Sequence, residues 1–193
     1  VHLLWGRGSS IIEGLFPGFI DGLVRAGAPY FDGDLSKVYI DNGGQAMPSE
    51  GHIDDFEFVL PSRPMLECHV RQRVYNADNI EIRDGHDVVE LITADGGVSG
   101  AVIRARDGRS DQVVEADLVI DAMGRGGRTP AFLEGMGYGR PAEDGLNVRM
   151  MYSSRPVRLP TAALREVAVI IGPVPGRPVG MGLFRNENNN WLF

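Results

Sequence analysis

One stretch near the middle of the chain, EADLVIDAMGRGGRTPAFLEGMG at residues 115–137, restricts the fold more than any other. The apolar run at 118–120 does not alternate with polar residues, so we expect a strand buried on both faces of a parallel sheet. A glycine-rich turn follows, and TPAFLEGMG predicts a short helix that ends at Gly135 or Gly137. A strand that opens through glycines onto a helix is the kind of place where α/β sheets bind ligands.

The turn has the chemistry of a loop that binds an anionic, hydroxyl-bearing ligand. Gly124 lets the backbone approach a ligand closely, and Arg125 and Arg128 can bind phosphate. Asp121, at the end of the expected strand, can accept hydrogen bonds from ligand hydroxyls. The same residue types occur in ordinary strand-to-helix loops, where an aspartate only shapes the turn. Both interpretations stay open from the residues alone.

The rest of the chain alternates between helical and strand patterns. Residues 2–27 predict two short helices broken at Pro17-Gly18, and residues 61–77 predict a helix that Ser62 can cap. Hairpin turns are expected at DGG (95–97) and at DG (107–108). The expected strands are KVYI, FEFVL, 80–85, 88–97, 98–108, 116–124, 146–157, 166–172 and the C-terminal hairpin PVPGRPVGMGLF with RNENNNWLF.

Composition argues against several classes of protein. The 193 residues carry 19 basic and 26 acidic side chains, a net charge of −7, and no basic run, so we expect no nucleic-acid partner. No apolar run approaches the roughly 18 residues that span a bilayer, so we expect no membrane span. The single cysteine, Cys68, excludes an internal disulfide and favours a reducing compartment, the cytoplasm. We expect Cys68 in the core or at its boundary. The composition leaves the oligomeric state open.

Signatures of metal and hydrolase chemistry are missing from the sequence. GHIDD at 51–55 places His52 near Asp54 and Asp55, but no second cluster supplies further ligands, so an acidic loop is the simpler interpretation and we expect no metal. Neither G-x-S-x-G nor H-E-x-x-H occurs. No catalytic residue can be assigned on this basis.

Two segments carry a resemblance to a known family. ADLVIDAMGRGGRTPAFLEGMGY resembles the internal Asp-Gly fingerprint of FAD-dependent oxidoreductases of the aromatic-ring hydroxylase type, the para-hydroxybenzoate hydroxylase-like flavoproteins. Asp121, Gly124, Gly127 and Arg128 fall on that pattern, which implies contact with FAD. LPSRPMLECHVRQRV is similar to the family's helix whose leading arginine faces the flavin, which implies that role for Arg63.

Other positions follow from the same resemblance. HLLWGRGSSIIEGLFPGFIDGLVRAGA resembles the helices that follow the family's N-terminal FAD motif, and the strands at 80–115 lie between the arginine helix and the fingerprint, as in the family. Val88 occupies a strand that passes the adenine in family members, although its residue type equally suits a strand core. His2 is either close to the flavin or on the polar surface.

The resemblance implies a mixed α/β (α+β) fold in two parts. Residues 1–30 and 61–137 would form a partial FAD/NAD(P)-binding Rossmann-like domain with a β-meander. Residues 31–60 and 138–193 would form part of an antiparallel β-sheet substrate domain. In that part an apolar pocket or the core is expected to take up the following side chains: Met150, Met151, Tyr152, Met181 and Phe184.

The resemblance also implies an activity for the whole protein. It would be a flavin monooxygenase that hydroxylates an apolar or aromatic small molecule with NAD(P)H and O₂. The alternatives are a reductase or halogenase of the same fold, such as the geranylgeranyl reductase-like group, or a non-catalytic truncated remnant. The family's G-x-G-x-x-G motif does not occur in the chain, nor does its C-terminal Gly-Asp motif. We therefore expect an internal fragment that by itself is inactive and binds FAD weakly or not at all.

Overall fold

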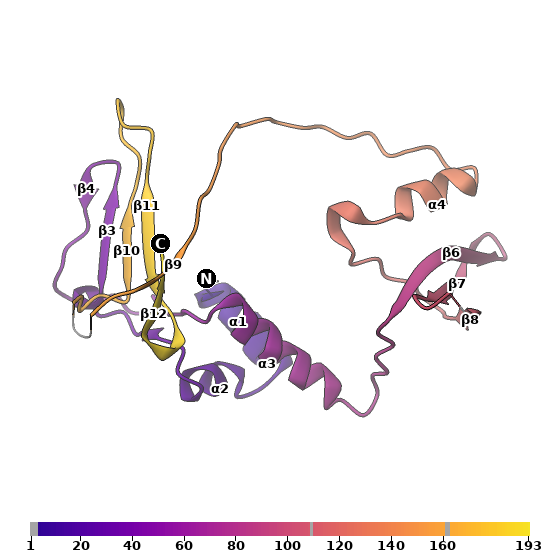
Figure 1. The fold of residues 1–193 in the computed structure, drawn as a ribbon, viewed down its shortest axis with the longest axis horizontal. Coiled ribbons are helices and arrows are strands. Elements are labelled where there is room, and N and C mark those ends of the chain that lie inside the picture. Colours follow the sequence, from indigo (N-terminus) through magenta and orange to yellow (C-terminus); the bar gives the residue numbers. More distant parts are fainter. Residues whose placement is uncertain (1–3, 109, 161–162) are drawn as a thin grey trace. The chain divides into compact units, whose positions relative to one another are not determined.

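The computed structural model describes residues 4–108, 110–160 and 163–193, which form two compact units. The first unit combines the chain up to Ile80 with Met151–Phe193, and the second is Glu81–Met150. Figure 1 shows the helices and sheets of each unit. Helices and mostly antiparallel strands occur together, so the expected mixed α/β fold is confirmed.

The first two helices of the first unit are separated as expected. α1 is Gly6–Leu15 and α2 is Phe19–Arg25, with Gly18 between them in the left-handed conformation at a φ of 77°. The carboxylate of Glu13 accepts the backbone N–H of Ile20 at 3.0 Å and that of Gly18 at 2.5 Å. These two hydrogen bonds lower the pKa of Glu13 and satisfy donors that the start of α2 would otherwise leave free.

The third helix, α3, is Arg63–Tyr75, and its start is fixed from two sides. The Ser62 hydroxyl accepts the backbone N–H of Met65 at 3.2 Å, as expected for a helix cap. The backbone N–H of Ser62 donates to the carboxylate of Glu187 at 2.9 Å, which comes from the far end of the chain. Part of the helix packs against a buried cluster made of Phe19, Leu23, Ala28 and Val59.

Two sheets lie in the first unit. The smaller one has the antiparallel order β1-β5-β2, formed by Leu4–Trp5, Phe58–Val59 and Tyr30–Phe31. The rings of Phe31 and Phe58 stack with their centroids 4.6 Å apart. The larger sheet has the order β4-β3-β10-β11-β12-β9. Its strands are Gln45–Ala46, Val38–Asn42, Ala168–Ile171, Met181–Arg185, Asn190–Leu192 and Pro156–Arg158.

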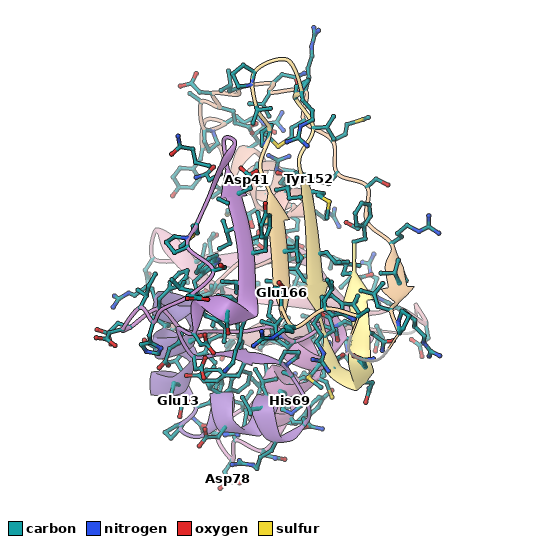
Figure 2. The ribbon with its side chains drawn as sticks, turned by 90° about the vertical axis from the view of Figure 1, so that its left-hand side faces the viewer. Glu13, Asp41, His69, Asp78, Tyr152 and Glu166 are labelled. Carbon is teal, nitrogen blue, oxygen red and sulfur yellow. The ribbon has the colours of Figure 1, made fainter. Side chains whose placement is uncertain are left out.

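A single parallel pair lies inside this larger sheet. β3 runs parallel to β10, with Val38 opposite Ala168 and Asp41 opposite Ile171. Both Val38 and Ala168 are buried in a cluster that also contains Phe31 of the smaller sheet. In Figure 2 the strands of this sheet stand above the helices, with Asp41 at the end of β3 far from them. This buried cluster of the first unit therefore lies where the two sheets meet.

The second unit contains an antiparallel meander followed by a loop and a helix. Its strands are β6 (His86–Ala94), β7 (Gly97–Ala105) and β8 (Asp111–Glu115). Asp95 and Gly96 connect the first two with φ values of 51° and 80°. Two positive φ values in a two-residue loop define the type I′ hairpin that an Asp-Gly pair favours, so this turn is confirmed.

Three predicted strands differ in the structure. Residues 118–120 do not form a buried strand, because the side chains of Leu118 and Ile120 are 73% and 78% exposed. A strand exists only when its backbone pairs with a neighbour, and among the described residues no strand pairs with this run. Residues 80–85 and 146–155 also lack regular structure. The sequence pattern therefore predicted strands at positions where, among the described residues, no other strand pairs with the backbone.

Several side chains expected in the core lie on the surface. Cys68 is exposed on α3, because it lies off the stripe of α3 that packs against the core. Met150, Met151 and Tyr152 are 63%, 93% and 87% exposed, so they do not fill a core. Phe184 does pack against the core of the first unit.

The assignment of 1–30 with 61–137 to FAD binding, and of 31–60 with 138–193 to substrate binding, stays a prediction. His2 lies outside the described residues. Among the described residues, no helix has the length and apolar character needed to cross a membrane.

Glu187→Gln is expected to lower the stability of the first unit by about 1 kcal/mol at neutral pH, because the carboxylate holds the start of α3. Burial alone would raise the pKa of Glu187, but hydrogen bonds from Ser62 outweigh it and leave the pKa below its ordinary value of 4.5. A carboxyl group with a lowered pKa stabilises fully above its unfolded value, and this contribution is lost as the pH falls through its folded value.

Urea unfolding of the 193-residue chain at about pH 7 and about pH 3 measures this effect. Glu50→Gln, at an exposed loop position of the same unit, is the control and should leave stability unchanged. A deficit in Glu187→Gln that is equally large at both pH values would contradict the role of the charge.

Candidate functional site

The glycine-rich turn of the second unit folds around the carboxylate of Asp121. Its Oδ1 accepts the backbone N–H of Met123 at 2.7 Å, and its Oδ2 accepts the hydroxyl of Thr129 at 2.5 Å. The bond from Thr129, followed by that from Met123, lowers the pKa of Asp121. The side chain is therefore an ionised carboxylate at neutral pH, and it ties the two ends of the turn together.

Two glycines of the turn are needed for different reasons. Gly124 begins the short 3₁₀ turn Gly124–Gly126 with a φ of 66°, which favours glycine, and a side chain there would meet nothing within 4 Å. Gly127 has an ordinary φ of −60°, but a Cβ there would lie 2.8 Å from Oδ2 of Asp121. The backbone at Gly124 is thus open to an approaching group, and Gly127 makes room for the carboxylate.

Arg128 lies between the turn and helix α4, Thr129–Gly135. Its guanidinium carbon is 5.2 Å from the centroid of the Phe132 ring, within the range of a cation–π contact. Within the described ranges no carboxylate forms an ion pair with Arg128. The ring positions this guanidinium while leaving its hydrogen-bond donors available to an anion.

A cavity of about 270 Å³ lies between this turn, α4 and the meander. Three of the predicted cofactor-binding residues, Val88, Asp121 and Arg128, line it together. Most of the remaining lining is apolar, and it consists of Leu91, Val98, Val119, Ile120, Met123, Thr129, Phe132 and Leu133. The cavity therefore combines an apolar wall with one acidic and one basic side chain.

Arg63 belongs to the first unit and is the first residue of helix α3. Its Nε donates to Oε1 of Glu67 at 2.6 Å, one turn along α3, and this pairing raises its pKa. The side chain is 70% exposed. An exposed pair of this kind contributes little to stability, so an anionic ligand can displace Glu67 at low cost. Contact between Arg63 and a cofactor stays a prediction.

Thr129 and Phe132 also belong to the site, although no sequence pattern indicated either of them. Thr129 follows Asp121 by eight residues, a spacing that matches no helix or strand period, and the two side chains meet only when the turn has folded.

His52, considered above as a metal ligand, has its Nε2 3.5 Å from Oδ1 of Asp54. Over the described part of the chain, no group of three His, Cys, Asp or Glu side chains could hold a metal ion.

Comparison with known proteins identifies the family to which this chain belongs. Residues 54–187, more than half of the chain, match the family described as FAD binding domain. The chain belongs to this family, and the resemblance to FAD-dependent oxidoreductases is confirmed.

Individual relatives agree with this assignment. Protein Rv3254 of Mycobacterium tuberculosis is 31% identical over 204 residues, which cover 100% of this chain and 42% of that protein. The structure is similar to that of pqsL from Pseudomonas aeruginosa, a probable FAD-dependent monooxygenase, with a TM-score of 0.70, 12% identity and coverage of 98% of this chain and 48% of that one. It is also similar to the flavin-dependent brominase Bmp2, with a TM-score of 0.57, 17% identity and coverage of 97% and 44%. The chain thus spans less than half the length of each of these relatives, and the two structural matches show the fold alone.

Gly127→Ala is expected to displace the Asp121 carboxylate and break its hydrogen bond to Met123. Losing a hydrogen bond worth about 1 kcal/mol should speed amide exchange at Met123 about fivefold. Hydrogen exchange followed by NMR measures the exchange rate of the Met123 amide in each variant. Gly126→Ala is the matched control, because a Cβ there meets nothing within 4 Å. Equal exchange rates in the two variants would show that the close approach to Asp121 is not what the glycine serves.

Proposed function

We propose that the chain is part of an FAD-dependent monooxygenase that uses NAD(P)H and O₂ to hydroxylate an apolar or aromatic small molecule. The observation that carries the proposal is the meeting of Val88, Asp121 and Arg128 on one apolar cavity beside an open glycine turn. Membership of the FAD binding domain family supports FAD as the molecule that this cavity receives.

The chemistry of these residues fits such a cofactor. The planar guanidinium of Arg128 can bind a phosphate oxygen through two parallel hydrogen bonds. Each oxygen of Asp121 already accepts one hydrogen bond and has a second lone pair for a ligand hydroxyl. Gly124 leaves backbone open to close approach. The cavity volume of about 270 Å³ is small for a dinucleotide, so these residues would hold only one part of FAD. Contact between Arg63 and the cofactor is a separate part of the proposal.

FAD, when bound, supplies hydride and oxygen chemistry that side chains cannot perform. The residues of this chain would bind and orient it. The apolar wall, which includes Leu91 and Phe132, would exclude water from the part that enters the cavity. This division of labour explains why the sequence contains no evident pair of acid and base residues.

Two other functions use the same fold. The likeness to a flavin-dependent brominase keeps halogenation, together with reduction, as the second candidate. A monooxygenase inserts one atom of O₂ into its product, a halogenase requires a halide ion, and a reductase forms its product without O₂. A non-catalytic remnant would retain no flavin.

The complete protein, reconstituted with FAD, is expected to consume O₂ when NADH or NADPH is added, and an accepted aromatic substrate should accelerate this consumption. Mass spectrometry after reaction under isotopically labelled O₂ should then find one labelled oxygen atom in the product. Product formation without O₂, or only with added halide, would reject the monooxygenase in favour of the second candidate. Protein that stays free of flavin after reconstitution would reject both.

Arg63→Ala in the complete protein is expected to weaken FAD binding about tenfold, the loss of one charge-assisted contact to a phosphate. Flavin fluorescence titration measures the dissociation constant. Arg71→Ala is the matched control, an exposed arginine two turns later on the same helix. Unchanged affinity in Arg63→Ala, or an equal loss in both variants, would remove Arg63 from the cofactor site.

A further inference from the structure

A second cavity lies wholly within the first unit, and the proposed function does not use it. Its volume is about 390 Å³, within the range of small-molecule sites. Its polar lining comes from Tyr30, Lys37, Arg165, Arg185, Asn186 and Asn189. Three of these six side chains are basic, in a chain whose net charge is −7.

Backbone pairing at one end of the larger sheet brings the basic side chains together. The N–H of Val167 donates to the carbonyl of Lys37 at 2.7 Å, and the N–H of Arg185 donates to the carbonyl of Val167 at 2.8 Å. These residues therefore lie side by side where β3 and β10 begin and β11 ends. Arg165 reaches the same cavity from the segment just before β10. The fold thus gathers cations from three separate parts of the sequence.

The two arginines have no ion-pair partner among the described residues. Within the described ranges, no carboxylate forms an ion pair with Arg165 or Arg185, and this includes the adjacent Glu166. Like charges gathered in one place repel each other unless an anion lies between them. An oxyanion is the ligand that two guanidinium groups bind best, because their planar donors match its geometry.

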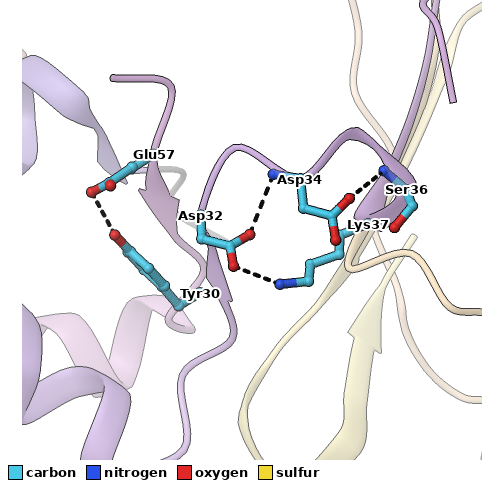
Figure 3. A network of polar contacts seen from close by, with 6 residues as sticks. All are labelled: Tyr30, Asp32, Asp34, Ser36, Lys37 and Glu57. Atoms are coloured by element: carbon cyan, nitrogen blue, oxygen red, sulfur yellow. Dashed lines mark hydrogen bonds and ion pairs between the residues drawn. The ribbon is translucent and has the colours of Figure 1, made fainter. Parts of the chain in front are cut away.

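The neighbouring acids are engaged elsewhere. Lys37 donates a hydrogen bond to Asp32 at 2.7 Å, and the Tyr30 hydroxyl donates one to Glu57 at 2.5 Å. Both contacts are drawn as dashed lines in Figure 3. Burial, followed by the contact with Glu57, raises the pKa of Tyr30 to about 12, so this ring is an uncharged wall of the cavity. Glu187 is held by the start of α3, as described above. The residues that line the cavity include three basic side chains and no acidic one.

Asn186 adds a polar group without a partner. Its Oδ1 is buried and accepts no hydrogen bond from any described residue. A buried polar atom without a partner is unusual in a native fold and calls for an explanation such as a ligand or a water molecule. The torsion that orients an asparagine amide is soft, so a small rotation can turn this oxygen toward a donor in the cavity.

We propose that this cavity binds a small organic molecule that carries one oxyanion, a carboxylate or a phosphate, together with a hydroxyl group. Arg165 and Arg185 bind the oxyanion, and the Asn186 amide accepts the hydroxyl hydrogen. Tyr30 lies along the body of the ligand. The proposal rests on the first unit alone and does not require FAD.

Calorimetric titration of the 193-residue chain tests the proposal with 3-hydroxybenzoate and three related probes. Each of the three differs from 3-hydroxybenzoate by one group: 3-hydroxyphenyl phosphate, benzoate and 3-hydroxybenzamide. At least one of the two hydroxylated anions should bind, and the tighter one identifies the oxyanion. Benzoate lacks the hydroxyl group and should bind less tightly than 3-hydroxybenzoate. The neutral amide should show no binding. Failure of both hydroxylated anions to bind, or equal binding of the amide, would overturn the proposal without affecting the proposed flavoprotein function.

Arg185→Gln should weaken binding of the tighter probe about tenfold, and the double variant with Arg165→Gln should abolish it. Arg177→Gln is the matched control, since Arg177 lies in the β10–β11 connection, outside the cavity. Circular dichroism checks that each variant is folded. Affinity that does not change in folded Arg185→Gln, or that falls equally in Arg177→Gln, would show that the cations do not form the site.

Discussion

The parallel pairing of β3 with β10 is the contact on which the first unit depends. It joins residues 38–42 to residues 168–171, and backbone bonds of 2.7 Å from Val167 to Lys37 and from Gly172 to Asp41 extend it at both ends. The entropic cost of closing a loop grows only slowly with its length, so the second unit can occupy the interval. Burial of apolar side chains where the two sheets meet offsets that cost.

Features set by neighbouring residues could be predicted from the sequence, and features set by distant partners could not. The break at Gly18, the cap at Ser62 and the Asp95-Gly96 turn each depend on a few adjacent residues, and all three form as expected. The run at 118–120 has the composition of a buried strand but no pairing strand among the described residues. Leu118 and Ile120 stay exposed, because an apolar run forms a buried strand only where the fold provides a neighbouring strand to pair with it.

In the candidate sites too, residues close together in the sequence could be predicted and residues brought together by the fold could not. Asp121, Gly124 and Arg128 belong to one short motif, so the sequence identified them together. Phe132, which positions the Arg128 guanidinium, carries no signal except helical spacing. The cation cluster of the first unit was beyond sequence reasoning, because Lys37 and Arg185 become neighbours only through Val167. A charge pattern along the chain says little about charges that a sheet brings together.

The arginines of this protein differ in the partners that the fold gives them. Among the described residues, four pair with carboxylates on the surface, namely Arg63, Arg83, Arg104 and Arg106. Arg128, Arg165 and Arg185 line cavities and have no such partner within the described residues. A protein with a net charge of −7 repels anions at a distance, but salt screens that repulsion beyond about 10 Å. The proposed anion binding would therefore depend on guanidinium groups that the fold holds at a cavity wall, because attraction at short range exceeds the screened repulsion of the whole molecule.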